Sequence, residues 1–536
     1  MRSTQSVFPL ASSASTISAP AKARATAQPP HPAPAHKGWQ GHRPLYQQLA
    51  VPQPTGEARQ RGAQFVQRLL LDCAAQPCDL PESPEGLSAW MHAQSDKAAA
   101  QYTEYLQARR TGAARRYFSN RAHALHFLQS VAPTKVVDGS WLYGLVAHAD
   151  NPRLQPLVRT YVEELGDGQP GKNHVTLYRK LLQQHGLSDL AGGDGHGNGL
   201  DDSLYVQGLV QLALGWNAEE FLPEIAGFNL AYEQLPLHLL ITAYELDELG
   251  IDPCYFTLHV TVDNRSSGHA RMACDAVAGL APLHGGAAAA DSFWQRVRSG
   301  ALLADAGAST TQVIAGFDIK AEMLRIFRAK AGAGAGVHSD YCRVAGRTIN
   351  AWLAVPEEMP QFLTALEGNG WIRRGEPPQA SRFWGLLQGE RAEMFGVFSA
   401  YELQVICDWL RGPVLSADGM PFQEVAAATA VSVNDGAAPT PHRRPGFRAL
   451  QRVASRTAEG DLASAGGAVN AASSARADLA DDGLLDTDLP AFREHLRSLQ
   501  GAARQQALVA AMSPAEHWTP TGLYATRQFV AQSGLC

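Results

Sequence analysis

The sequence has few of the features that mark several large classes of protein. Cysteine occurs only seven times in 536 residues, at scattered positions and without a CxxC pair, so neither a disulfide framework nor a zinc–thiolate site is indicated. No uncharged apolar run of about 18 residues is present, so no membrane-spanning helix is expected. Charged residues make up 18% and the net charge is −6, which gives no electrostatic reason to expect binding to nucleic acid or to an anionic membrane. We therefore expect a soluble protein of the reduced cytoplasm.

Acidic residues are absent from the first 56 positions, which are rich in alanine, serine, proline and basic residues. Organelle transit peptides and disordered tails share this composition. No apolar segment of the secretory type follows the early positive charge, so secretion is not expected. A disordered tail over residues 1–53 is the interpretation that we favour.

Strand-like alternation is almost lacking, whereas helical spacing is frequent. The segment TGEARQRGAQFVQRLLLDCAA repeats apolar residues at i, i+3, i+4 and i+7, and HVTLYRKLLQQHGL ends in a glycine typical of a helix stop. These patterns predict an all-α protein with its main helical domain over residues 54–330. Residues 340–415 are predicted to form a small helical or winged-helix-like module, for which packing or oligomerisation is favoured over DNA binding. Residues 416–536 are predicted to be a low-complexity, partly helical and largely disordered tail.

Carboxylate and imidazole groups recur in the helical segments of the main domain. Glu163 and Glu164 end one helical run and His174 begins the next, with a break rich in glycine and proline between them. In an unbroken helix Glu163 and His174 would share a face, but the break removes that constraint. Glu224 and Glu233 are nine residues apart and would lie on roughly opposite faces of one helix, so only one of them is expected to face an interior site.

A last segment adds an Asp and two His residues. His259 and Asp263 are four positions apart, so their side chains meet on one face of a helix. His269 reaches that face only if residues 266–268 bend the helix. A single histidine on an apolar helix is usually a hydrogen-bonded core residue, and a single glutamate is usually solvated or caps a helix.

Together, these residues form a four-helix set of oxygen and nitrogen donors. Helical bundles build dinuclear iron or manganese sites from such inward-facing groups. Carboxylate oxygens with a few imidazoles suit iron or manganese better than a structural zinc site. The residues therefore predict two metal ions inside the bundle.

Three stretches, EELGDGQPGKNH, PEIAGFNLAYE and LHVTVDNRSSGHA, resemble the heme-oxygenase-like diiron oxidases and oxygenases, also described as iron-containing redox enzymes. The resemblance covers about residues 122–279 and implies a heme-oxygenase-like helical bundle. It differs in one place, because members usually show HxxxDxxH, whereas here Ser266 stands at the last position and the next histidine lies six residues past Asp263. The metal ligands that the resemblance implies are Glu164, His174, Glu233, His259, Asp263 and His269, with Glu163, Glu224 and Asp138 as alternates.

The resemblance implies oxygen chemistry. Members use two Fe ions and O2 to oxidise a bound amine, amino acid or fatty acid, so two irons, with manganese as the alternative metal, a small-molecule substrate and an electron donor are expected. Neither nucleic acid nor a membrane is an expected partner, and a homodimer stays open. Metal-free oxidases of the same fold and a non-catalytic helical binding or regulatory protein are the alternatives. A heme oxygenase would need a proximal histidine, for which His123 or His126 is available, but it would leave the carboxylates unexplained.

Overall fold

The computed structural model describes residues 41–187, 200–389, 392–412 and 488–534. The regular secondary structure of these residues is helical except for a short antiparallel hairpin of β1 (Arg343–Val344) and β2 (Arg347–Thr348). The all-α class predicted from the scarcity of strand-like alternation is thus confirmed. Most of the predicted N-terminal tail, residues 1–40, and residues 416–487 of the predicted C-terminal tail lie outside the described residues.

The described residues before 319 form thirteen α-helices. In chain order they are α1 (His42–Leu49), α2 (Gly56–Cys73), α3 (Leu87–Arg110), α4 (Arg121–Lys135), α5 (Gln155–Glu164), α6 (His174–Gln184), α7 (Val206–Trp216), α8 (Leu222–Tyr232), α9 (Leu237–Glu248), α10 (Cys254–Val262), α11 (His269–Leu280), α12 (Gly286–Leu302) and α13 (Thr310–Ala315). Two short 3-10 segments matter for the site, η2 (Ser140–His148) and η3 (Gly166–Gly168).

The later described helices fall into two sets. The first contains α14 (Ile319–Gly334), α15 (Ile349–Leu353), α16 (Met359–Gly368), α17 (Arg382–Gln388) and α18 (Ala400–Arg411). The second contains α20 (Asp488–Ser498), α21 (Gly501–Ala511) and α22 (Pro520–Ser533).

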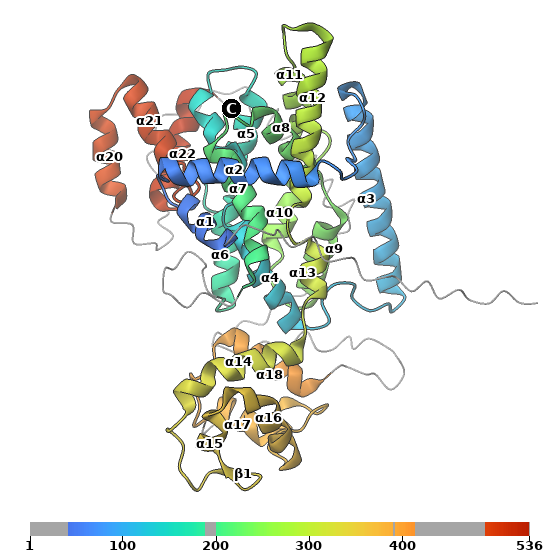
Figure 1. Ribbon diagram of the computed structural model, residues 1–536, viewed down its shortest axis with the longest axis vertical. Helices are drawn as coiled ribbons and strands as arrows, with labels where there is room; N and C mark the ends of the chain where they lie inside the picture. Colours follow the sequence, from blue (N-terminus) through green and yellow to red (C-terminus); the bar gives the residue numbers. More distant parts are fainter. Residues whose placement is uncertain (1–40, 188–199, 390–391, 413–487, 535–536) are drawn as a thin grey trace, which may run out of the picture. The chain divides into compact units, whose positions relative to one another are not determined.

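Helix α7 is the centre of the main helical body. It is apolar on all sides and is buried along most of its length, as expected for a helix enclosed by others. Its neighbours are α1, α2, α4 and η2, while α8 and α12 pack side by side (Figure 1). A Cβ at Gly215 would lie 1.9 Å from the carbonyl oxygen of Ser140, so only glycine permits this contact between α7 and η2. The contact fixes the backbone directly after Asp138.

Helix α1 lies within the segment that its composition assigns to the N-terminal tail. Leu45 and Leu49 are fully buried, and the helix packs against α7. Asp202 accepts the backbone N–H groups of His42 at 2.8 Å and Arg43 at 2.9 Å, which satisfies the start of the helix. The stabilising partner is 160 positions away in the chain, so local composition does not reveal it.

The segment from α14 to α18 contacts the main body through α18. Helix α18 packs on α14 and on α4. Asp408 of α18 accepts the backbone N–H of Ala122 at 2.8 Å, in the first turn of α4, and a hydrogen bond from the Gln404 side chain at 2.9 Å. The helix that leads to Asp138 is therefore capped from this segment.

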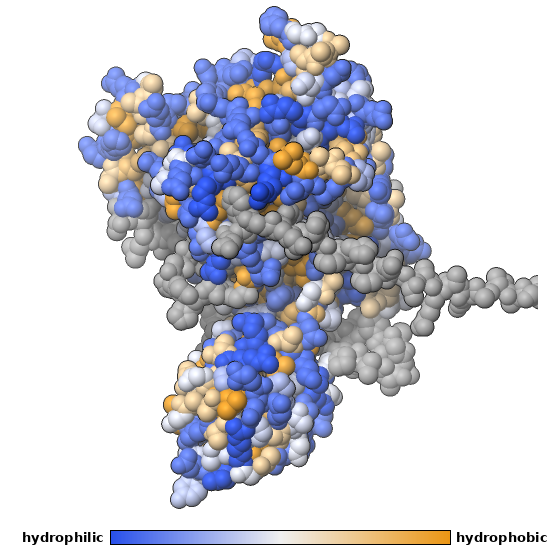
Figure 2. Space-filling view, in the orientation of Figure 1, coloured by the Kyte–Doolittle hydropathy of each residue, from blue (hydrophilic) through white to orange (hydrophobic). Residues whose placement is uncertain are grey.

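The face in Figure 2 is predominantly hydrophilic, with smaller hydrophobic patches. Large hydrophobic side chains that are exposed include Leu71 of α2 and Leu283 before α12. Among the helices in the described ranges, none is long and apolar enough to cross a membrane.

Glu245 of α9 supports a stability prediction. Its buried carboxylate accepts the backbone N–H groups of Tyr117 at 3.0 Å and Phe118 at 2.9 Å, and the hydroxyl of Tyr105 at 2.8 Å. The variant Glu245→Ala leaves these donors unsatisfied, so we expect the free energy of unfolding to fall by about 3 kcal/mol. Urea denaturation measures the change, and the exposed Glu104→Ala serves as the control. Equal midpoints for both variants would contradict the prediction.

Candidate metal centre

The predicted ligand residues gather at helix ends. Glu164 is the last residue of α5 and His174 the first of α6, while His269 begins α11. The breaks at residues 165–173 and 263–268 turn the chain so that these side chains point inward. The structure brings together seven buried groups, namely Asp138, Glu164, His174, Glu233, His259, Asp263 and His269.

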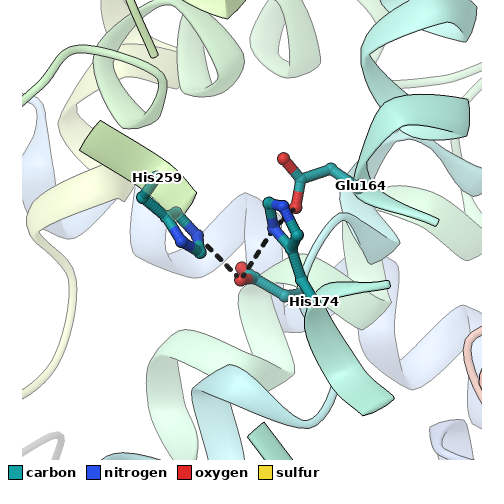
Figure 3. Close-up of side chains that lie close together, drawn as sticks. Glu164, His174 and His259 are labelled. Carbon is teal, nitrogen blue, oxygen red and sulfur yellow. Dashed lines mark ion pairs between the residues drawn. The ribbon is translucent and has the colours of Figure 1, made fainter. Parts of the chain in front are cut away.

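Asp138, Glu164, His174 and His259 form the first donor group, in which one ligand atom of each residue lies within 4.8 Å of the others. Asp138 Oδ2 lies 3.3 Å from His259 Nε2 and 3.9 Å from His174 Nδ1. The rings of His174 and His259 are 4.4 Å apart between centroids, with Glu164 beside His174 (Figure 3). Two imidazoles and two carboxylates therefore converge on one point.

Two atoms of the first donor group approach each other without a hydrogen bond. His174 Nδ1 and Glu164 Oε2 are 2.5 Å apart, yet both are buried and neither has a partner in hydrogen-bond geometry. Buried polar atoms in folded proteins are nearly always satisfied. A cation held by both lone pairs would satisfy them and would offset the cost of burial.

His269 is at the centre of the second donor group. Its Nδ1 lies 3.0 Å from Glu233 Oε2 and 3.3 Å from both Glu164 Oε1 and Asp263 Oδ1. One imidazole nitrogen carries at most one proton, so it cannot make good hydrogen bonds to three carboxylates at once. In addition, Glu233 Oε1 and Asp263 Oδ1 are buried without a hydrogen-bond partner. This arrangement suits a metal ion bound by one nitrogen and three carboxylates.

Glu164 belongs to both donor groups. Its Oε2 lies beside His174 and its Oε1 beside His269. Because the two oxygens of its carboxylate face different groups, this side chain links the two donor groups.

A comparison with protein families gives a match over residues 125–304, to the iron-containing redox enzymes. The chain is similar to that family over these residues, as the resemblance in the sequence led us to expect. The matched segment contains all six residues of the two donor groups and also Asp263, which lies 3.3 Å from His269. No curated protein and no solved structure matches the chain.

The His259, Asp263 and His269 group of the matched segment departs from the spacing expected from the resemblance. Helix α10 ends at Val262, and Asn264 Oδ1 accepts the backbone N–H groups of Ser266 at 2.9 Å, Ser267 at 3.1 Å and Gly268 at 3.2 Å. This turn takes up the additional residues between Asp263 and His269. The chain then re-enters a helix with His269 pointing into the site.

The three alternate metal ligands named from the sequence lie in different surroundings. Glu224 is bound by the Arg296 guanidinium at 2.6 Å through both oxygens and is not part of either donor group. Glu163 lies at the edge, where its Oε2 contacts His269 Nε2 at 3.1 Å, so it orients that ring. Asp138 is central, and the Tyr255 hydroxyl donates to its Oδ2 at 2.6 Å.

Burial and mutual attraction shift the pKa values of the site. Burial favours a neutral His259, but the hydrogen bond and charge of Asp138 raise its pKa to about 9. Burial likewise opposes the charged form of His269, yet Glu233 and the other carboxylates hold its pKa well above the usual value. Burial raises the pKa of Glu233 to about 8. For Glu164 burial acts in the same direction, but His174 holds its pKa well below the usual value.

Lys135 adds a positive charge beside the first donor group. Its ammonium lies 5.6 Å from the ring centroid of Tyr232 and 5.7 Å from that of Tyr255. Burial opposes the charged form of Asp138, but Lys135 and His259 together hold its pKa below the usual value. The carboxylates of the site are thus partly neutralised by a cation that the chain itself supplies.

The two histidines considered for heme are engaged elsewhere. His123 Nε2 lies 2.8 Å from the Ile314 carbonyl oxygen, and its Nδ1 accepts the Ser119 N–H at 3.3 Å. His126 Nδ1 lies 3.3 Å from the Tyr401 hydroxyl. Neither ring belongs to the two donor groups.

Proposed function

We propose that the chain is a non-heme diiron oxidase or oxygenase that uses O2 to oxidise a small organic substrate, such as an amine, an amino acid or a fatty acid derivative. The observation that carries the proposal is the position of Glu164 between two groups of buried donors. The similarity of residues 125–304 to the iron-containing redox enzymes supports iron as the metal.

The donor set fits two divalent ions. One ion would be held by Asp138, Glu164, His174 and His259, and the other by Glu164, Glu233, Asp263 and His269. The charges of four carboxylates balance those of two divalent cations, which reduces the cost of burying them. Hard oxygen donors with a few imidazoles are what iron or manganese prefers. Iron held by these residues would supply the electrons that reduce O2.

Neighbouring side chains hold the ligands in place. The Tyr255 carbonyl oxygen contacts His259 Nδ1 at 3.0 Å, so the Nε2 of this ring faces Asp138. Likewise, the Glu163 carboxylate contacts His269 Nε2, so the Nδ1 of that ring faces the second donor group. Such partners fix the tautomer and the orientation of a ligating imidazole. Trp141 and Phe228 pack next to Tyr232, the residue before Glu233, and keep water away from that ligand.

A small cavity borders the second donor group. Its wall contains Asp263 together with Gln94, Ser95 and Arg265. A molecule as small as O2 would fit there, and a small-molecule substrate and an electron donor complete the reaction. The proposal places the protein in a reduced cytoplasm, with which the six free cysteines among the described residues agree.

Metal analysis of anaerobically reconstituted protein tests the proposed function. We expect about two iron ions per chain and a transient visible absorption when O2 is admitted. Folded protein that takes up no stoichiometric iron or manganese would favour the metal-free oxidase or the binding-protein alternative.

Substitution of one histidine in each donor group should remove only the iron ion bound by that group. We expect His259→Ala and His269→Ala each to lower the iron content by about one ion per chain while helicity is retained, because each removes a ligand of a different group. Elemental analysis and circular dichroism measure the two properties. The exposed His148→Ala, in η2, is the matched control. Full iron content in either site variant would remove that histidine from the ligand set.

A further inference from the structure

The last described helices contact the loop between two proposed ligands. Residues 488–534 lie outside the family match at residues 125–304. Nevertheless α22 packs on η3, which is part of the loop 165–173 between Glu164 and His174. The Arg527 guanidinium donates to the Gly168 carbonyl oxygen, and a Cβ at Gly168 would lie 2.4 Å from the carbonyl oxygen of Leu523. The backbone of this loop therefore rests directly on α22.

Asn173, the residue before His174, ties the loop to the same C-terminal region. Its side chain is fully buried, and Oδ1 accepts the Thr176 N–H at 2.9 Å, which caps α6. Its Nδ2 lies 3.3 Å from the Leu165 carbonyl oxygen and 3.2 Å from His517 Nδ1. One amide group thus links both ends of the loop to His517.

Further contacts reach the two flanking helices. The Tyr161 hydroxyl, on α5, donates to the Met512 carbonyl oxygen at 2.6 Å. On α6, the Thr176 hydroxyl donates to the Trp518 carbonyl oxygen at 3.4 Å, and the Arg179 guanidinium lies 3.8 Å from the Trp518 ring centroid. The C-terminal region therefore holds α5, the loop and α6 together.

The loop needs such support because its backbone is irregular. Gly166, Asp167 and Gly168 have φ values of 63°, 52° and 77°. Three consecutive residues in the left-handed region cannot form a regular helix, and the region is unfavourable for Asp167. Metal ligands, in contrast, must be held within about 0.5 Å of their working positions. Contacts from outside the loop have to supply that precision.

We propose that residues 512–527, which we call the C-terminal brace, position the loop 165–173 so that Glu164 and His174 converge on the metal centre. His517 is the main positioning residue, because its Nδ1 holds the Asn173 amide. The proposal rests on the proposed function for the identity of the metal. The contact between brace and loop is independent of it.

The test compares His517→Ala with His517→Asn in the full-length chain. In the Asn variant the side-chain oxygen takes the place of Nδ1 as the acceptor for Asn173. The exposed His495→Ala, on α20, is the matched control. The first measurement is hydrogen exchange of the backbone amides at residues 165–177 in metal-free protein. We expect exchange about tenfold faster in His517→Ala, restored in His517→Asn and unchanged in the control.

The second measurement is the retention of iron against a chelator. We expect about tenfold weaker retention in His517→Ala, with recovery in His517→Asn. If His517→Ala does not fold, the same measurements on Arg527→Met test the proposal, because this variant removes the hydrogen bond to the Gly168 carbonyl oxygen and leaves His517 and Asn173 unchanged. A folded variant whose backbone hydrogen exchange and iron retention equal those of the wild-type chain would overturn the proposal. Absence of iron from the wild-type chain would instead count against the proposed function. The hydrogen-exchange measurement would still test whether the C-terminal brace positions the loop.

Discussion

Glu164→Gln is expected to empty both metal positions at once. The two oxygens of Glu164 lie 2.5 Å from His174 Nδ1 and 3.3 Å from His269 Nδ1, so the side chain serves both donor groups. Glutamine keeps the shape, but it replaces one oxygen with an amide nitrogen that donates and removes a negative charge. Two divalent ions would then share three carboxylates. We expect the iron content to fall from about two ions per chain to near zero.

Glu224→Gln is the matched control for this experiment. Glu224 is also buried, and the substitution is chemically identical, but its carboxylate is held by Arg296 outside the two donor groups. The control should therefore bind iron as the wild-type chain does. Elemental analysis of both proteins, at equal helicity, gives the result. Retention of two irons by Glu164→Gln would show that no bridging carboxylate is required.

The helical fold was predictable because its signal is local. The spacing of apolar residues and the stop signals indicate helices, and the breaks at residues 165–173 and 263–268 are visible as Gly, Pro and Ser clusters. Helical periodicity alone placed Glu163 on the face of His174. The left-handed residues of η3 turn the chain instead, so that Glu164 faces inward, while Glu163 contacts the outer nitrogen of His269 and the Arg159 guanidinium.

Other features of the site depend on contacts between distant residues. Asp138 lies in a turn between α4 and η2, where no periodicity applies, and its position is fixed by Tyr255, 117 positions away. Glu224 carries the same residue type as Glu233, and only its pairing with Arg296 separates the two. The His517–Asn173 contact spans 344 positions and lies at the end of a region with low-complexity composition. Local patterns carry no information on such pairings.

Metal affinity is expected to rise steeply with pH, because the metal-free site holds protons that an ion must displace. His259 has a pKa raised to about 9 and Glu233 one raised to about 8, so both are protonated at neutral pH without metal. For each proton that the metal displaces, the metal affinity rises about tenfold per pH unit. Displacement of protons from these two groups therefore makes the affinity rise about hundredfold per pH unit below pH 8. Competition with a chelator for Mn²⁺ at several pH values measures the slope. In His259→Ala the number of protons displaced by the metal should fall by about one. A metal affinity independent of pH would contradict the assignment of His259 and Glu233 as protonated ligands.

The metal-free protein should show the opposite trend in stability. Both groups have a pKa that is higher in the folded than in the unfolded chain. The stability that His259 contributes is therefore complete below its unfolded pKa of about 6.5 and is lost as the pH rises through about 9. The contribution of Glu233 is lost between about pH 4.5 and about pH 8 for the same reason. Because bound metal replaces these protons, the difference in melting temperature between loaded and metal-free protein should widen as the pH increases.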